Sequence, residues 1–472
     1  MLDRLVIVLF TQLADRQEVM FLARLWQLFK CMRTAITIIL LDLAALPLLA
    51  QETWTMNRCI QYAVEHNNGV RKQRLEVRQS KVDERTARLD LLPTVSAQTT
   101  AQYAWGRNIN PETNTYNTIT TFNNYYSIGA EVPLFDGGRT WNAFQQARLA
   151  RVKSMTVLQK TADDKAIAVM AKFVEAVYSQ QSIGLARRKL ADSQALLRKT
   201  RAMFDLGEKS RPDVAQMESQ VAEDDYSLLH QQNAASLALM ALKAEMNFPV
   251  DDSLALDTLL TASLSVADDA ENLYAAFQAE SPEVRTAAFN VKNARYHYLI
   301  QRGQLLPVLA LGGGINTNYY RNLSQGSSKA DNFRKQFNNN MGEYVYLSLS
   351  IPLFMPSRWR AARRAKADWE ASKLDLEDAR RKLHDDIAQA VLDRDGYSRE
   401  LMKMERKTAA DSIAWHLASR KYEEGMLSTF DLYTAAQTLL DSRIKLLQMR
   451  LMLEMKQRLV NYYKGIRTWT LK

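Results

Sequence analysis

The chain has 472 residues with only 16 glycines and 10 prolines, so most of it must lie in a few very long elements. Long stretches rich in Ala, Leu, Gln, Lys, Arg and Glu predict a mainly α protein with some β-structure. The formal net charge of +10 does not indicate a nucleic-acid partner, because Lys and Arg alternate with Asp and Glu along the predicted helices.

The N-terminal region has the layout of a secretory signal. A basic flank precedes an apolar run from Ala35 to Leu49, and cleavage is expected after Ala50. No cysteine follows the run immediately, so a lipid anchor at the cleavage point is not indicated. We therefore expect residues 1–50 to be an upstream extension and a signal peptide, with translation starting at Met32. A buried N-terminal helix is the alternative.

The rest of the chain aligns with itself, which indicates a duplicated structural unit. "LLPTVSA" at 91–97 matches "LLPVLAL" at 305–311, and later segments match at a nearly constant offset. Proline, glycine and aspartate stay in register, which shared helical composition alone would not produce. We expect a first repeat at 51–250, a connector at 251–281 and a second repeat at 282–467.

Repeat 1 begins with a helix at 69–91, followed by strands at about 93–105 and 125–135. Each strand is expected to be about ten residues long, with a polar loop between the two. A long helix at 138–204 and a return helix at 212–247 complete the repeat, and Gly207 marks the turn between them. The long helix contains no proline and would extend about 100 Å at ~1.5 Å per residue.

Repeat 2 has the same order of elements. A helix at 283–305 leads into strands at about 307–320 and 342–354, a long helix at 357–422 and a return helix at 429–464. In both repeats the strands alternate apolar with small or polar residues and carry aromatic residues near their loops. This pattern fits a transmembrane β-barrel, with a soluble β-sandwich as the alternative.

In each repeat, a similar sequence connects the second strand to the long helix: "VPLFDGGR" at 132–139 and "IPLFMPSR" at 351–358. A proline stops the hydrogen-bonded ladder of a strand. We expect the bend between strand and helix to depend on the conformational freedom of glycine in repeat 1 and on a second proline in repeat 2. The residues predicted to form these joints are Pro133, Gly137, Gly138, Pro352 and Pro356.

Four strands cannot close a barrel, and open sheet edges are not tolerated in lipid. The protomer is therefore expected to oligomerise, with two copies giving eight strands and three giving twelve. Three copies would leave room for a lumen. The long helical hairpins would then project from one face of the membrane, which in a two-membrane bacterium is the periplasmic face.

With its paired Pro-Leu-Phe joints, paired Leu-Pro strand entries and paired glycine turns, the chain resembles the TolC family of outer-membrane efflux proteins over residues 53–467. The resemblance implies a homotrimer with a twelve-stranded β-barrel continuous with a twelve-helix α-barrel. It also implies an exit duct in the outer membrane, joined to a periplasmic adaptor and an inner-membrane pump of RND or ABC type. Residues 248–281 and 53–68 would form equatorial elements.

In this family the periplasmic tip is a gate, closed by interactions of the second-repeat hairpin. Tyr422, Gly425 and Asp431 match that motif, and Asp213 takes the equivalent place in repeat 1. Three copies of Asp431 around the axis would attract cations. The alternative for both aspartates is a helix N-terminal position that interacts favourably with the macrodipole.

The gate motif is incomplete, because Leu427 stands where the family can have a gating arginine and Thr434 where it can have a second aspartate. The turns at 206–210 and 425–429 resemble the adaptor-contact tips of the family, with ordinary helix capping as the alternative. The predicted tip residues are Gly207, Ser210, Gly425, Leu427 and Ser428.

No catalytic constellation is present in the sequence, and we expect no enzyme activity, metal or cofactor. The five histidines lack metal-ligand spacing, and Cys31 and Cys59 form neither a disulfide framework nor a metal pair. A periplasmic coiled-coil scaffold or adaptor would explain the long hairpins but not four amphipathic strands. It is the alternative to an outer-membrane channel.

Overall fold

The computed structural model describes residues 53–110, 114–258, 268–324 and 332–471. The predicted extension, signal peptide and start at Met32 lie outside these residues. No helix in the described ranges is both long and apolar enough to cross a lipid bilayer.

The chain divides into two units. In the smaller one, Trp54 forms a parallel bridge with Leu256, supported by backbone hydrogen bonds from Trp54 to Ala255 and from Asp257 to Trp54. The larger unit contains every helix and strand described below.

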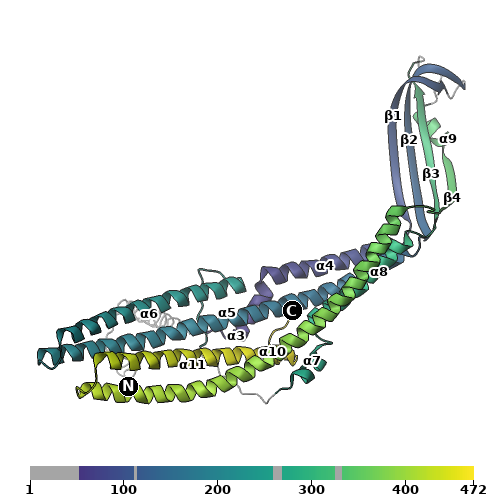
Figure 1. Ribbon diagram of the computed structural model, residues 1–472. Coiled ribbons are helices and arrows are strands. Elements are labelled where there is room, and N and C mark those ends of the chain that lie inside the picture. The colour runs from purple at the N-terminus through teal and green to yellow at the C-terminus, as the bar shows by residue number, and fades with distance from the viewer. Residues whose placement is uncertain (1–52, 111–113, 259–267, 325–331, 472) are drawn as a thin grey trace, which may run out of the picture. The chain divides into compact units, whose positions relative to one another are not determined.

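Two long helical hairpins dominate the larger unit (Figure 1). The first consists of α5 (Arg139–Asp205) and α6 (Arg211–Met246), and the second of α10 (Pro356–Glu423) and α11 (Thr429–Tyr463). The helices of each hairpin pack along each other. At ~1.5 Å per residue, the 67 residues of α5 extend about 100 Å, as predicted.

Shorter helices pack against the hairpins. α4 (Asn68–Leu89) lies along α5, and α8 (Pro282–Gly303) contacts both α5 and α10. α3 (Met56–His66) buries one face against α5, and α7 (Ala270–Phe277) packs on α10. The predicted connector at 251–281 thus contains one short helix among its described residues.

The best-buried part of the helices is the middle of α5. Val169, Phe173 and Val177 are fully buried there, at the spacing of a helix face that packs against neighbours. Nearby, the buried carboxylate of Asp163 accepts hydrogen bonds from Tyr462 and Trp469, which ties the end of the chain to α5. Burial raises the pKa of Asp163, although these hydrogen bonds act in the opposite direction.

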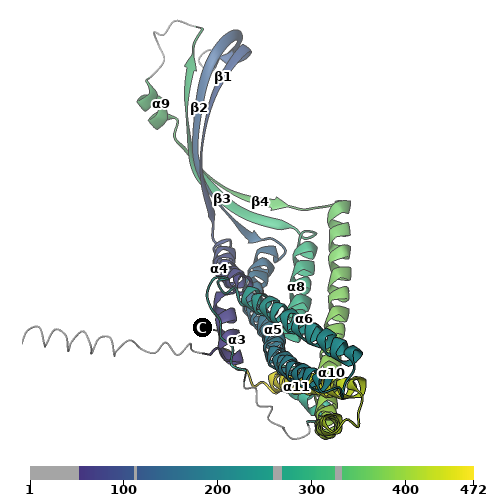
Figure 2. The same ribbon diagram turned by 90° about the vertical axis from the view of Figure 1, so that its left-hand side faces the viewer.

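The strands form one antiparallel sheet in the order β1-β2-β3-β4, with β1 and β4 at its edges (Figure 2). Their bounds are Thr94–Asn110, Thr115–Phe135, Val308–Asn322 and Gly342–Ser350. The sheet therefore takes two strands from each repeat. The central pairing joins the repeats, because β2 lies against β3.

The prediction of ten-residue strands separated by a polar loop was wrong for repeat 1. β1 has 17 residues and β2 has 21, and they remain paired up to Asn110 and Thr115. The segment 106–124, between the predicted strands, is polar and rich in Thr and Asn. Threonine favours strands when the ladder satisfies the backbone. In repeat 2 a short helix that was not predicted, α9 (Phe333–Asn339), lies between β3 and the shorter β4.

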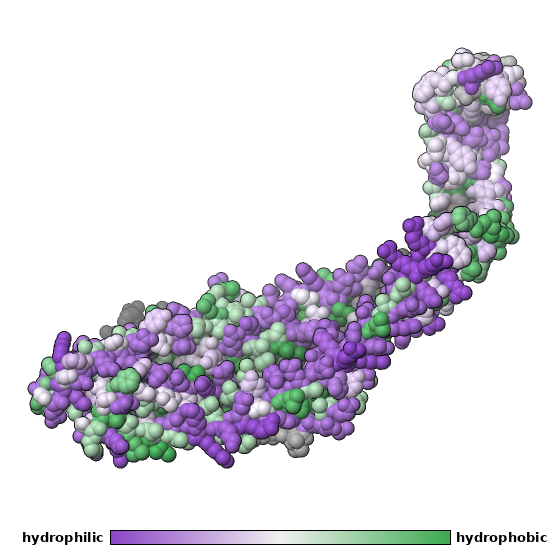
Figure 3. Space-filling model, viewed as in Figure 1, coloured by the Kyte–Doolittle hydropathy of each residue, from purple (hydrophilic) through white to green (hydrophobic). Residues whose placement is uncertain are grey.

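The two faces of the sheet differ in character. Register places Val95, Ile128, Leu311, Val345 and Leu347 on one face, which we call the apolar face, and all five side chains are exposed. Ser96, Ser127, Glu131, Tyr346 and Ser348 lie on the other, polar face. Figure 3 shows hydrophobic surface gathered at the end of the sheet that joins the helices.

Candidate functional site

The tips of the two hairpins are built alike. Gly207 and Gly425 have φ of 82° and 73°, a left-handed conformation that glycine adopts without a steric penalty. After each helix, the glycine N–H donates to a carbonyl of the last turn. The N–H of the residue after the glycine donates to the carbonyl of the preceding residue in that turn. This is the Schellman arrangement, so both predicted turns end their helices where the sequence indicated.

The next helix of each hairpin is capped by a serine and an aspartate. Ser210 donates from its backbone N–H and hydroxyl to Asp213, at 3.0 and 2.6 Å. Ser428 donates its hydroxyl to Asp431 at 2.6 Å and accepts from the Asp431 N–H at 3.1 Å. Both aspartates therefore occupy the helix N-terminal position that was the alternative to a gate role.

Two hydrogen bonds connect the tips of the two hairpins. The fully buried hydroxyl groups of Tyr422 and Thr200 lie 2.8 Å apart, and Thr200 also donates to the Leu196 carbonyl. Tyr422 must therefore donate to Thr200. On the adjoining turn, the buried Thr429 donates to Asp213 at 3.0 Å. The predicted residues Tyr422 and Asp213 are thus brought to the junction between the hairpins, whereas Asp431 contacts Ser428 of its own turn.

Sequence reasoning missed the partners of these residues. Thr200 and Thr429 carry no signal in the sequence beyond being threonines near a predicted tip. Lys209 was also missed, and its Nζ lies 4.5 Å from the centroid of the Tyr422 ring, a cation–π distance. An ion pair of 2.9 Å between Lys199 and Glu423 adds a further contact between the hairpins.

The two positions that depart from the family motif lie on the second hairpin. Leu427 is half-buried in the turn, and Thr434 donates its hydroxyl to the Phe430 carbonyl within α11. The tip also exposes large apolar side chains, since Leu206 is 77% exposed, Met426 66% and Phe430 62%.

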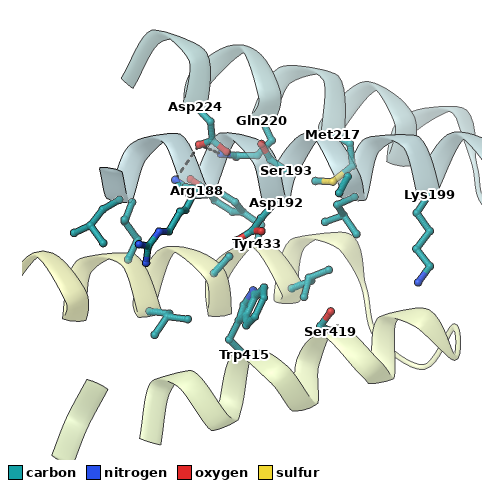
Figure 4. Close-up of a pocket in the computed structure, with 18 of the residues that line it drawn as sticks. Arg188, Asp192, Ser193, Lys199, Met217, Gln220, Asp224, Trp415, Ser419 and Tyr433 are labelled. Carbon is teal, nitrogen blue, oxygen red and sulfur yellow. Dashed lines mark hydrogen bonds and ion pairs between the residues drawn. The ribbon is translucent and has the colours of Figure 1, made fainter. Parts of the chain in front are cut away.

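A cavity of about 330 Å³ lies between the hairpins, next to the tips. Figure 4 shows Asp224 and Gln220 on one side and Trp415 on the opposite side. Asp224 is buried and forms a 3.0 Å ion pair with Lys189, which also donates to Gln437 of the second hairpin at 2.6 Å. The buried ion pair therefore belongs to the contact between hairpins.

The joint of repeat 1 depends on two glycines. Gly137 and Gly138 have φ of 73° and 78°. A Cβ on Gly137 would lie 2.4 Å from the Gly303 carbonyl oxygen, so this turn packs directly on the end of α8. The carboxylate of Asp136 accepts from the N–H and hydroxyl of Thr140 at 2.8 and 2.6 Å, which starts α5.

The two joint prolines behave differently. The expectation that the ladder stops at Pro133 was wrong, because β2 continues past it with an irregularity in register. The strand ends at Phe135, the bound predicted for it. The irregularity accommodates the missing N–H. β4 does end at Ser350, before Pro352, and Pro356 occupies the first turn of α10, where a missing N–H is harmless.

A family model described as "Outer membrane efflux protein" matches residues 59–247 and 273–461. The chain belongs to the outer membrane efflux protein family. One match falls on each repeat, which confirms the tandem duplication and the resemblance to the TolC family.

Individual members of the family are also similar to this chain. It is 22% identical over 362 residues to the outer membrane efflux protein BepC of Brucella suis, covering 74% of this chain and 73% of BepC. The structure of VceC from Vibrio cholerae matches with a TM-score of 0.76 at 14% identity, covering 87% and 96% of the two chains. CmeC from Campylobacter jejuni matches with a TM-score of 0.75 at 13% identity, covering 87% and 85%.

As an outer membrane efflux protein, the chain acts in the outer membrane of a Gram-negative bacterium, as an exit duct for exported compounds. The fold is TolC-like, mainly α with a small antiparallel sheet. This decides against the alternative of a periplasmic scaffold without a pore. In the described part of the chain, no group of three or more His, Cys, Asp or Glu side chains is arranged to hold a metal ion.

Proposed function

We propose that three copies of this chain form the outer-membrane duct, with a twelve-stranded β-barrel and a twelve-helix α-barrel. The single observation that carries the proposal is an open four-stranded sheet with one apolar and one polar face. In a bilayer its edge strands β1 and β4 must find partners, because an unpaired backbone group costs several kcal/mol. Pairing β4 of one copy with β1 of the next satisfies β4 and the facing part of the longer β1.

The number of copies follows from the size of the lumen. Eight strands enclose a space that side chains fill, whereas twelve enclose a wider, water-filled interior. The polar face would line that interior, and the apolar face would contact lipid. Three copies of the four long helices then give the twelve helices of the periplasmic barrel.

Apolar side chains that are exposed on α6 and α10 support association between copies. On α6, Leu229 and Leu237 are 56% and 66% exposed, and on α10, Leu374 and Leu392 are 62% and 68% exposed. Such side chains are expected to become buried between neighbouring copies.

We further propose that the junction of the two tips closes the periplasmic end of the duct. Tyr422 with Thr200, and Asp213 with Thr429, hold the two hairpins of one copy together. Releasing them would allow one hairpin to move away from the other. Asp431, exposed on its turn, is proposed to contribute the charge at the entrance.

The exposed tips are proposed to bind a periplasmic adaptor that connects the duct to an inner-membrane pump, of RND or ABC type. Gly207, Ser210, Gly425 and Ser428 are exposed there, next to the apolar side chains of the turns. A cross-linking amino acid placed at Met426 should capture the adaptor in cells, and one placed at exposed Lys445, higher on α11, should not.

The role is transport through a water-filled duct, without a catalysed reaction or a cofactor. Protein purified from outer membranes and reconstituted in a planar lipid bilayer should give discrete steps of ionic current. A protein that is recovered from the soluble periplasm and gives no such steps would contradict the proposal.

A further inference from the structure

A row of aromatic side chains crosses the apolar face of the sheet near the end farthest from the helices. Trp105 and Tyr103 of β1, Phe122 of β2, Tyr319 of β3 and Phe333 of α9 follow one another. Their successive ring centroids lie 6.3, 4.8, 6.2 and 5.4 Å apart. α9 lies beside β3, because the Gln336 side chain accepts from the Tyr320 N–H at 2.9 Å and donates to the Tyr320 carbonyl at 3.0 Å. Its Phe337 also packs on Tyr126 of β2, with centroids 5.5 Å apart.

On three strands, the aromatic residue of the row lies equally far from an apolar residue at the helix end of the same face. The intervals Val95–Trp105, Val132–Phe122 and Leu309–Tyr319 have equal length, and the residues at both ends lie on the apolar face. Each interval is about 34 Å along the strand at ~3.4 Å per residue. At a strand tilt of about 40°, it spans about 26 Å along the membrane normal, close to the ~25 Å apolar band of membrane barrels.

From β1 to β2 and from β2 to β3, the aromatic residue of the row shifts by two residues toward the helices, relative to directly paired positions. Trp105 pairs with Thr120, so Phe122 lies one same-face position lower, and Tyr319 pairs with Asn124, one position lower again. A plane parallel to the membrane cuts tilted strands along such a diagonal. The row therefore marks one boundary of the hydrocarbon region.

Positive side chains follow immediately beyond this boundary. Arg107 and Arg321 are the next residues on the apolar face after Trp105 and Tyr319, and both are exposed. Arg334 and Lys335 of α9 are exposed next to Phe333, at the level of the row itself. Arg107 also lies over the Tyr116 ring, 5.7 Å from its centroid. The acidic residue described on this face is Glu343, which pairs with Ile315 on the helix side of the row.

We propose that Arg107, Arg321, Arg334 and Lys335 form a binding surface for the phosphate groups of a phosphorylated glycolipid in the outer leaflet. The next residue on the same face, two residues beyond Trp105 or Tyr319, lies about 5 Å further along the membrane normal, at the level of lipid headgroups. Arginine side chains bind phosphate oxygens in a bidentate manner. The inference rests on the outer-membrane location and adds the chemistry of the lipid that surrounds the duct.

The test uses the full-length protein in mild detergent. Its thermal stability is measured against increasing concentrations of diphosphorylated lipid A, and separately against lipid A from which both phosphates have been removed. The wild-type protein should bind the diphosphorylated lipid at least about tenfold more tightly, since each basic residue near an anionic surface contributes several-fold to binding. The preference should weaken as salt is raised.

The variant R107Q/R321Q/R334Q/K335Q should lose this preference. The control R399Q/K403Q/R406Q/K445Q, which removes four exposed charges from α10 and α11, should keep it. Equal binding of both lipids by the wild-type protein, or an unchanged preference in the first variant, would overturn the proposal. Single-channel current of the same preparations tests the duct separately, because the first variant should still conduct ions.

Discussion

Removing one hydroxyl group at the junction of the hairpin tips should loosen the closed state of the duct. The change is Tyr422→Phe, which deletes the donor to Thr200 and keeps the ring in place under Lys209. Both hydroxyl groups are fully buried, so water does not replace the lost partner without rearrangement of the tip.

The size of the effect follows from this geometry. A hydrogen bond between neutral groups contributes about 1 kcal/mol net, and an acceptor left buried without its donor raises the loss toward ~2 kcal/mol. Since 1.4 kcal/mol is a factor of ten in an equilibrium, opening of one copy should become about five- to thirtyfold more favourable. If three copies open together, the effects multiply to at least about a hundredfold.

The open probability of single channels in planar bilayers measures this directly. In cells, the same change should increase entry of a large hydrophilic antibiotic that an intact outer membrane excludes. Tyr226→Phe is the matched control, because Tyr226 lies on α6 of the first hairpin and is 64% exposed. It should leave the open probability unchanged.

A double-mutant cycle separates the hydrogen bond from other effects of the substitution. Thr200→Val should open the channel to a similar degree, and the double variant should add little to either single change. The reasoning is refuted if Tyr422→Phe leaves open probability and antibiotic entry at the wild-type level. It is equally refuted if the two substitutions act independently.

Three other changes test the tip and the joint, and a fourth, within α5, serves as a control. The side-chain and backbone hydrogen bonds from Ser210 lower the pKa of Asp213, so its stabilising contribution is present above its unfolded pKa of about 3.9 and is lost as the pH falls through the lower folded value. Thr429 of the second hairpin also lowers the pKa of Asp213 through its hydrogen bond across the junction. Channel opening should therefore increase on acidification below about pH 4, and Asp213→Asn should flatten this dependence in a conductance titration. Gly137→Ala should destabilise the protein in thermal unfolding by at least about 2 kcal/mol, because its φ is positive and its Cβ would collide with Gly303. Gly184→Ala, in open space within α5, should instead stabilise it by about 0.5–1 kcal/mol. Asp431→Asn should lower the cation selectivity of single channels, and an unchanged ion preference would exclude the proposed charge at the entrance.

The long helices were predictable because their signals are local. The sequence placed the first long helix at 138–204 and the structure has it at Arg139–Asp205, since the absence of proline and the glycine that ends the helix act within a few residues. The repeat made the second hairpin predictable from the first. Helix ends marked by Gly207 and Gly425 therefore agreed closely with the structure.

The distal half of the sheet could not be predicted in the same way. Residues 115–124 have no apolar alternation. They form strand because β1 satisfies their backbone groups along the whole segment, and β3 does so from Thr121 onward. Contacts between the hairpins could not be predicted either. Helix periodicity determines which face packs, but not the position of one hairpin along the other. The pairing of Thr200 with Tyr422 depends on that relative position.

The proposed duct requires that three copies of the chain close the barrel. Native mass spectrometry of the complex extracted from outer membranes in mild detergent counts them without assuming a register between neighbouring copies. The predicted result is a single species containing three copies of the mature chain, which supplies twelve strands from four per copy. A stable species of one or two copies that still conducts ions would contradict the proposed duct.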